Sequence, residues 1–246
     1  MSSSKRMVFL IYGIVSYAAF FGIFVYMIGF LTNLVVPKSI DGPVGDGGSG
    51  VLINVVLLGL FAIQHSTMAR PGFKAKWTKI VPEPIERSTY VLITSVLLIV
   101  MVLQWRPMTE TIIWQVDASA IRAILHGLSV LGFGIVLYSS CLIDHFDLFG
   151  LRQVVLCFRG QPYTSPVFRT RGLYRFIRHP LLAGFMIAFW SAPTMTAGHL
   201  LFAVATTVYM FIGLTLEERD LLNVLGEDYK QYRARTPMFL PLGKKG

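Results

Sequence analysis

The sequence has little charge, and acidic residues are the scarcer kind. Charged side chains make up 14% of its 246 residues, against about 25% in a typical soluble domain. There are 22 Lys and Arg but only 13 Asp and Glu. Hydrophobic residues account for 54%, and the mean hydropathy is +0.62. A soluble fold of this length could not bury so much apolar surface, so the lipid bilayer is the expected solvent.

Cysteine is also scarce. Cys141 and Cys157 are too few for a disulfide framework. Both lie at or beyond the cytosolic end of an expected span, so reduced thiols are the default. Together with His145 they would supply only three irregularly spaced ligands, and we therefore expect no metal site.

The sequence has no tandem repeat, low-complexity run or second soluble domain, so we expect one membrane domain over residues 1–246. Its parts would be a four-span bundle at 1–143 and, at 144–246, a cytosolic segment, a helical hairpin and a C-terminal cap. No cleavable signal peptide is expected, because the first apolar run, at about 8–36, is too long for a signal core.

Apolar residues gather in four long runs, at about 8–36, 51–69, 88–105 and 120–143. A transmembrane helix needs roughly 20 such residues. Two shorter apolar pieces, about 181–192 and 199–216, are each marginal for crossing alone, and a turn at 193–198 separates them. The pattern predicts an all-α integral membrane protein. It would have four full transmembrane helices plus a C-terminal helical hairpin, about five to six membrane helices in total.

Lysine and arginine alternate with the apolar runs. They are concentrated near the N-terminus, in the loop at 70–87, in the segment 144–178 and in the C-terminal tail. The loops at 37–50, 106–118 and 193–198 have few. Cytoplasmic loops are enriched in these residues, so we expect both termini and any catalytic site in the cytosol. This distribution indicates membrane lipid as a partner and no nucleic acid.

The segment Arg178-His179-Pro180 stands directly before the first hairpin helix. Proline costs nothing in the first turn of a helix, and the free N–H groups there can bind an anionic or polar ligand. A basic stretch before a helix-starting proline is also common in membrane proteins that bind no ligand there. The motif alone therefore leaves both interpretations open.

The pair Glu217-Glu218 is expected to close the second hairpin helix. Carboxylates are costly near hydrocarbon, so two of them at this position favour a ligand site. Adjacent helix positions point about 100° apart. One carboxylate would pair with Arg175 or Arg178, and the other would bind an ammonium group or sugar hydroxyls. The alternative is a salt-bridged helix end.

Gly226 predicts a helix stop, and Glu227-Asp228 then opens a short helix with acids at its favourable end. Tyr229 and Tyr232 are three positions apart and share a face of that helix. Such a cap could cover a planar ligand, although tyrosines are also ordinary at a membrane interface.

Taken together, the motifs between about 172 and 241 resemble the isoprenylcysteine carboxyl methyltransferase superfamily and its phospholipid methyltransferase relatives. The shared pattern is Arg-His-Pro, a hydrophobic hairpin, Glu-Glu, Gly-x-x-Tyr-x-x-Tyr and Pro-x-Phe-x-Pro. The resemblance implies a cytosolic pocket for S-adenosylmethionine, the methyl donor, which would leave as S-adenosylhomocysteine. By the same resemblance the pocket residues are Tyr174, Arg178, His179, Pro180, Gly184, Glu217 and Glu218.

Two segments of the N-terminal half, Gln64–Arg70 and His145–Gln153, resemble the NnrU-like branch. Within it they are most similar to bacterial membrane enzymes that methylate methanethiol to dimethyl sulfide. This resemblance covers nearly the whole chain and implies a methanethiol acceptor and a bacterial inner (cytoplasmic) membrane. The alternatives are an acceptor of another kind, a prenylcysteine carboxylate or a phospholipid amine, or a membrane factor without enzymatic activity.

Methylation of a thiol needs the thiolate, and small alkanethiols have pKa values near or above about 8.5. The protein must therefore supply a base, a positive environment or both. The candidates are His65 and Arg70 after the second apolar run, and His145 and Asp147 after the fourth. If these ends converge, an Asp–His pair would take the proton while Arg70 favours the anion. Asp144 is a second candidate for the carboxylate of this pair. The alternative for His65 is a purely structural role, in which it makes a helix-capping or interhelical hydrogen bond.

Overall fold

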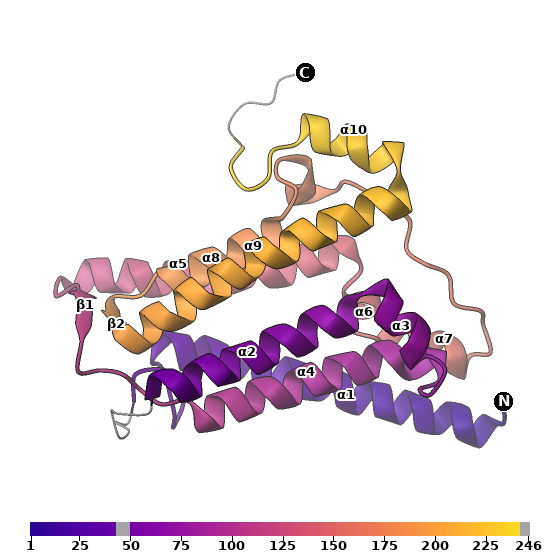
Figure 1. The fold of residues 1–246 in the computed structure, drawn as a ribbon, viewed down its shortest axis with the longest axis horizontal. Coiled ribbons are helices and arrows are strands. Elements are labelled where there is room, and N and C mark those ends of the chain that lie inside the picture. The colour runs from indigo at the N-terminus through magenta and orange to yellow at the C-terminus, as the bar shows by residue number, and fades with distance from the viewer. Residues whose placement is uncertain (43–49, 242–246) are drawn as a thin grey trace. The chain divides into compact units, whose positions relative to one another are not determined.

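The computed structural model describes residues 1–42 and 50–241, and most of them are helical (Figure 1). Within these ranges, five helices are long and apolar enough to cross a membrane. They are α1 (Ser3–Thr32), α2 (Gly50–Ala69), α4 (Glu83–Gln104), α5 (Ser119–Ile143) and α9 (Ala197–Leu225). The helical content and these five candidate spans confirm the prediction of an all-α integral membrane protein.

Local sequence explains where several helices begin and end. Glu83 and Glu86 lie in the first turn of α4, where acidic side chains interact favourably with the helix dipole. The side chain of Thr196 caps α9 by accepting a hydrogen bond from the backbone N–H of His199 at 3.1 Å. Gly226 ends α9 with φ at 58°, a conformation that favours glycine, and α10 (Glu227–Arg235) follows as predicted.

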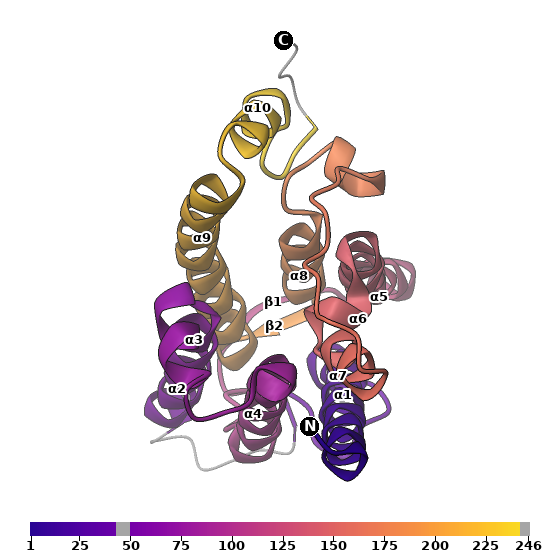
Figure 2. The ribbon, with the colours of Figure 1, turned by 90° about the vertical axis from the view of Figure 1, so that its right-hand side faces the viewer.

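The chain forms two compact units. The first consists of Met1–Thr111 and Asp144–Val167. In this unit α4 lies between α1 and α2 (Figure 2) and packs against both. The short helices α3 (Pro71–Trp77), α6 (His145–Leu148) and α7 (Leu151–Phe158) complete it.

Helix α7 fits closely against α1 because Gly13 has no side chain. A Cβ atom at Gly13 would lie 2.5 Å from Cγ2 of Val154, a side chain that is fully buried. Gly150, which precedes α7, has φ at 87°, and its carbonyl accepts a hydrogen bond from the Ser88 hydroxyl at 3.2 Å. These contacts tie the segment after residue 143 to the first unit.

The second unit consists of Ile112–Ile143 and the chain from Phe168 onward. Helices α5 and α8 (Pro180–Trp190) approach so closely that a Cβ atom at Gly132 would lie 2.6 Å from the Gly184 carbonyl oxygen. Small residues allow such backbone contact between membrane helices. Because α5 packs on α8, the division into units does not follow the boundary at residue 143 expected from the sequence.

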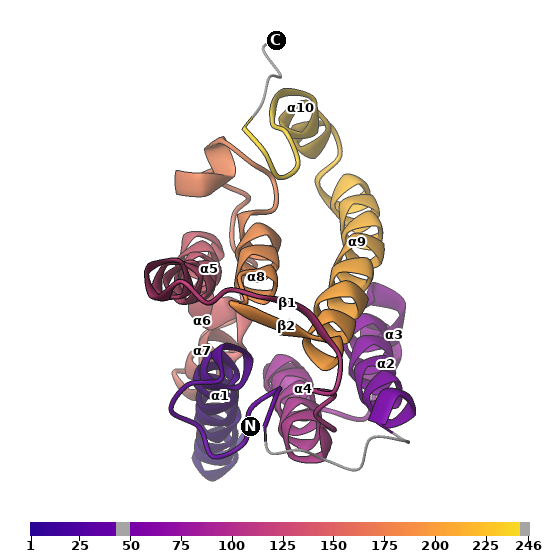
Figure 3. The ribbon, with the colours of Figure 1, turned by 90° about the vertical axis from the view of Figure 1, so that its left-hand side faces the viewer.

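A short antiparallel ribbon joins two connections of the second unit (Figure 3). β1 (Ile112–Gln115) precedes α5, and β2 (Thr194–Thr196) lies between α8 and α9. The indole N–H of Trp114 donates to the carbonyl of Ala192 at 3.0 Å. The sequence interpretation had loops at both places, since neither segment shows the alternation of a strand.

The C-terminal hairpin is less symmetrical than expected. Helix α8 has 11 residues, whereas α9 has 29 and a length of about 43 Å at ~1.5 Å per residue, more than the ~30 Å hydrocarbon core. The prediction that Glu217-Glu218 closes this helix is wrong, because α9 continues to Leu225. Hydropathy falls after Leu216, but no glycine or proline interrupts the helix before Gly226.

The α5–α8 contact yields a stability prediction. We expect Gly132→Ala to lower the free energy of unfolding by about 1–3 kcal/mol, because its Cβ atom would press on the backbone of α8. Gly134→Ala is the matched control on the same helix, since nothing lies within 4 Å of its Cβ position. Thermal unfolding in detergent measures both, and equal melting temperatures would contradict the proposed contact.

Candidate functional site

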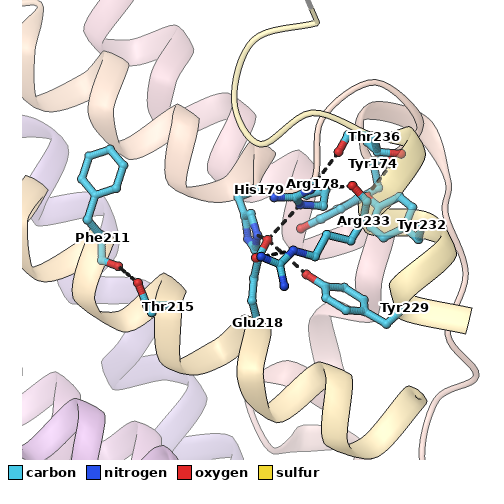
Figure 4. A network of polar contacts seen from close by, with 10 residues as sticks. All are labelled: Tyr174, Arg178, His179, Phe211, Thr215, Glu218, Tyr229, Tyr232, Arg233 and Thr236. Carbon is cyan, nitrogen blue, oxygen red and sulfur yellow. Dashed lines mark hydrogen bonds and ion pairs between the residues drawn. The ribbon is translucent and has the colours of Figure 1, made fainter. Parts of the chain in front are cut away.

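The carboxylate of Glu218 is the centre of a buried polar cluster in the second unit (Figure 4). Its Oε1 atom lies 2.8 Å from Nε of Arg178 and 3.1 Å from Nε2 of His179, and Oε2 lies 3.3 Å from Nε of Arg233. The Tyr229 hydroxyl donates to Oε1 at 3.4 Å. The structure thus brings together Arg178, His179 and Glu218, three of the residues expected from the sequence.

Both the side chain and the backbone of Arg178 are bound by other protein groups. Its Nη1 atom donates to the carbonyls of Arg233 at 2.9 Å and Thr236 at 3.0 Å, at the end of α10. Its backbone N–H donates to the Pro237 carbonyl at 2.9 Å, and that of His179 donates to Met238 at 3.2 Å. A buried guanidinium in these contacts fastens the C-terminal segment to the start of α8, so we assign Arg178 a positioning role.

Burial decides the protonation of the groups around Glu218. It lowers the pKa of His179, and the hydrogen bond to Glu218 only partly offsets this effect, so the imidazole is neutral at pH 7. Burial raises the pKa of Tyr174 and of Tyr229, and it raises that of Tyr232 to about 12. The tyrosines therefore stay protonated as hydrogen-bond donors, and the Tyr232 hydroxyl donates to the Tyr174 carbonyl at 2.7 Å.

A pocket of about 420 Å³ opens beside Glu218, within the range of small-molecule sites. Its lining consists of one face of α9 and two residues of the C-terminal segment: Phe211, Leu214, Thr215, Glu218, Arg219, Leu222, Asn223, Arg233 and Met238. Phe211 and Thr215 precede Glu218 along the same helix (Figure 4). One part of the pocket is thus apolar and the other carries carboxylate, guanidinium and amide groups.

Sequence reasoning missed the pocket residues Arg219, Asn223, Arg233 and Met238. Thr215, Arg219 and Asn223 are spaced by four and share a helix face with the expected Glu218. A helical projection would have found this face if the helix had been extended to Gly226. Arg233 and Met238 carry no such local signal, because their positions depend on how the cap folds back.

The remaining expected cofactor residues have other surroundings. Gly184 packs against α5, which accounts for the glycine, and Pro180 is buried in the first turn of α8. Tyr174 lies in a single 3₁₀ turn, Gly172–Arg175, and binds Tyr232 through its backbone. Glu217 is exposed next to the buried Glu218. None of these four residues lines the described pocket.

In the first unit, His65 lies near the end of α2 and pairs with Tyr90 of α4. The Tyr90 hydroxyl lies 2.9 Å from each ring nitrogen of His65. Arg70 follows one helical turn later, where its Nε donates to the carbonyl of Ser66 at 3.3 Å. Tyr90 was not among the expected residues, and nothing in its local sequence singles it out.

The expected Asp–His pair has different partners in the structure. The Asp147 carboxylate accepts from Nη1 of Arg152 at 2.9 Å and from the Tyr163 hydroxyl at 3.2 Å. His145 instead lies 2.8 Å from the Tyr17 hydroxyl through Nε2. Asp144, the competing candidate, caps α6 by accepting from the Asp147 backbone N–H at 3.1 Å. Both aspartates therefore support the segment that follows α5.

Fold and site define a polytopic helical membrane protein with a mixed polar and apolar pocket in its C-terminal half. Within this class the chain belongs to the NnrU protein family, whose model matches residues 52–232. No solved structure matches the chain.

Three named relatives are similar to this chain to different degrees. A methanethiol S-methyltransferase of Mycobacterium tuberculosis is 51% identical, with 96% of this chain and 97% of the relative aligned. Methanethiol S-methyltransferase 2 of Bradyrhizobium diazoefficiens is also 51% identical, over 96% of this chain and 91% of the relative. A Nurim homolog of Drosophila pseudoobscura is 28% identical over 71% of this chain and 70% of the relative.

The contacts of Arg178 predict a strong effect of its removal. Arg178→Met leaves Glu218 with less positive charge and two carbonyls without their donor, so we expect a loss of about 3–5 kcal/mol in unfolding free energy. Arg178→Lys keeps the charge but loses the forked geometry and should lose less. Thermal unfolding and protease cleavage of the C-terminal segment measure both.

Lys230→Met is the control for these variants. It removes an ion pair with Glu227 in which both side chains are about 70% exposed, so its effect should stay below ~1 kcal/mol. If Lys230→Met lowered the free energy of unfolding as much as Arg178→Met does, Arg178 would have no special role in fastening the C-terminal segment. The same would follow if no variant changed the free energy of unfolding.

Proposed function

We propose that this protein is an S-adenosylmethionine-dependent thiol S-methyltransferase that converts methanethiol to dimethyl sulfide. The observation that carries the proposal is 51% identity, over 96% of the chain, to a relative named methanethiol S-methyltransferase. The family assignment and the pocket in the C-terminal half support it.

The groups around the pocket fit the chemistry of the donor. S-adenosylmethionine carries an ammonium group, a carboxylate, ribose hydroxyls and a flat adenine. Glu218 and Asn223 offer acceptors for the ammonium group and the hydroxyls, and Arg219 offers a guanidinium for the carboxylate. Phe211 and Met238 provide apolar surface for the adenine.

The donor supplies an electrophilic methyl group on a sulfonium, and the chain's own residues would bind it and exclude water. Transfer to a thiolate is an in-line displacement that needs no covalent enzyme intermediate. Catalysis is then chiefly positioning in a dry site, together with removal of the thiol proton. His65 and Arg70 are the residues that we propose for the thiol side.

We further propose that the pocket faces the cytosol of a bacterial inner membrane and that both termini lie there. The β1–β2 ribbon brings together the connections before α5 and before α9, and the segments 106–118 and 193–198 are both poor in cations. Glu218 lies about 32 Å along α9 from its start at ~1.5 Å per residue, which corresponds to the opposite edge of the hydrocarbon core.

The activity has a direct test. Purified protein in lipid vesicles should release dimethyl sulfide into the headspace when S-adenosylmethionine and methanethiol are supplied together, and gas chromatography measures the product. Parallel samples would contain a phospholipid amine or a prenylcysteine in place of the thiol. Methylation of either of those acceptors without dimethyl sulfide from methanethiol would refute the proposed substrate.

The donor pocket has a separate test. Arg219→Met should weaken S-adenosylmethionine binding about tenfold or more, because a charge-assisted hydrogen bond contributes about 1.5–3 kcal/mol. The control is Arg235→Met, which changes an exposed arginine of α10 outside the pocket lining. Isothermal calorimetry measures both affinities, and unchanged binding in Arg219→Met would place the donor elsewhere.

A further inference from the structure

The segment between α2 and α4 concentrates positive charge in the first unit. Residues 70–87 contain five Lys or Arg and two Glu. Helix α3 and the turn after it connect the end of α2 at Ala69 to the start of α4 at Glu83. Both α2 and α4 are long and apolar enough to cross a membrane. The segment therefore lies at the edge of the bilayer, where lipid headgroups are found.

One face of this segment packs against the first unit. The rings of Phe73 and Trp77 stack with centroids 5.6 Å apart and planes 29° apart. Both rings pack against a buried cluster that consists of Met68 of α2 and Tyr90 and Val91 of α4. These apolar contacts fix α3 against the ends of the two long helices, so its other face has a defined position.

The other face presents two lysines and one apolar side chain. Lys76 and Lys79 are exposed, and Ile80 is 79% exposed. Hydrogen bonds close the turn that carries them. The backbone N–H of Lys79 donates to the Lys76 carbonyl at 3.2 Å. That of Ile80 donates to the Trp77 carbonyl at 3.0 Å. Cations next to an exposed apolar side chain are typical of segments that lie on a lipid surface.

Lys74 and Arg87 extend this positive charge toward α4. Burial lowers the pKa of Lys74, and the nearby charge of Arg87 lowers it further, whereas Glu86 opposes the effect. Glu86 is itself buried. In the part of the chain that the structure describes, neither these two cations nor Lys76 and Lys79 form an ion pair. Crowded cations of this kind are stabilised by an anion from outside the protein.

We propose that the cations of this segment and its exposed isoleucine bind the headgroup of an anionic phospholipid such as phosphatidylglycerol. The residues of this α3 surface are Lys74, Lys76, Lys79, Ile80 and Arg87. The cations bind the phosphate, and the isoleucine contacts the start of an acyl chain. A lipid fits this surface better than a soluble anion, because the surface adjoins two membrane spans and exposes an apolar side chain. The inference uses residues of the first unit only and does not depend on methyl transfer.

Lipid binding to the purified full chain in detergent micelles tests the inference. Fluorescence anisotropy would compare labelled phosphatidylglycerol with phosphatidylcholine that has the same acyl chains. The triple variant Lys74→Gln, Lys76→Gln, Lys79→Gln should lower the preference for phosphatidylglycerol about a hundredfold, at roughly fivefold per lysine. At about 1 M salt, where the Debye length is ~3 Å, the wild-type preference should also weaken.

The matched control removes three exposed cations of the second unit, through Arg169→Gln, Lys230→Gln and Arg235→Gln. It should keep the wild-type preference. The double variant Lys76→Gln, Lys79→Gln changes exposed side chains alone and should lower the preference about 25-fold at the same fivefold per lysine. Melting temperatures within error of wild type would show that each variant is folded.

Ile80→Ser tests the apolar part of the surface. It should weaken the binding of both lipids about tenfold and keep the preference between them, because it removes apolar contact but no charge. Unchanged binding of both lipids would contradict a contact between Ile80 and the acyl chain.

Three results would overturn the lipid site. The first is a preference for phosphatidylglycerol that the triple variant leaves unchanged. The second is an equal loss in the control, since overall charge would then determine the preference. The third is displacement of the lipid by an equal concentration of glycerol 3-phosphate or polyglutamate, which would show a site for soluble anions.

Discussion

A carboxylate buried in a membrane helix is stable only when positive charge and hydrogen-bond donors surround it, and Glu218 of α9 imposes this constraint on the second unit. Arg178 and His179, directly before α8, and Tyr229 and Arg233 of α10 meet it from two different segments. The same contacts determine where α10 lies, because the guanidinium that neutralises Glu218 also binds the last carbonyls of that helix. Charge neutralisation, the C-terminal cap and one wall of the pocket therefore depend on a single cluster.

The two units carry different kinds of polar chemistry. The second unit concentrates an acid, two arginines and apolar surface around one pocket. The first unit holds two histidine–tyrosine contacts, His65 with Tyr90 and His145 with Tyr17, and the guanidinium carbon of Arg87 lies 5.6 Å from the centroid of the Tyr90 ring.

Much of the fold could be predicted because helices in a bilayer depend on local composition. The four long apolar runs correspond to α1, α2, α4 and α5, and Gly226 marks the break before α10. The two errors, the end of α9 and the missed β1–β2 ribbon, arose because hydropathy reports neither where a helix ends nor which segments pair. The end of α9 depends on helix-forming residues beyond Leu216, and the β1–β2 ribbon depends on pairing between segments about 80 residues apart.

The sequence by itself determined that this protein is a helical membrane protein of the NnrU family, and its resemblance to known methyltransferases placed Arg178, His179 and Glu218 in one expected pocket. Only the tertiary structure decided what each polar side chain binds. It joined Arg178 to carbonyls 55 and 58 residues away, Tyr90 to a histidine 25 residues away, and Asp147 to Arg152 instead of His145. The reason is physical: spacing along a helix determines which residues share a face, but a buried polar group takes whichever partner another segment brings within about 3 Å.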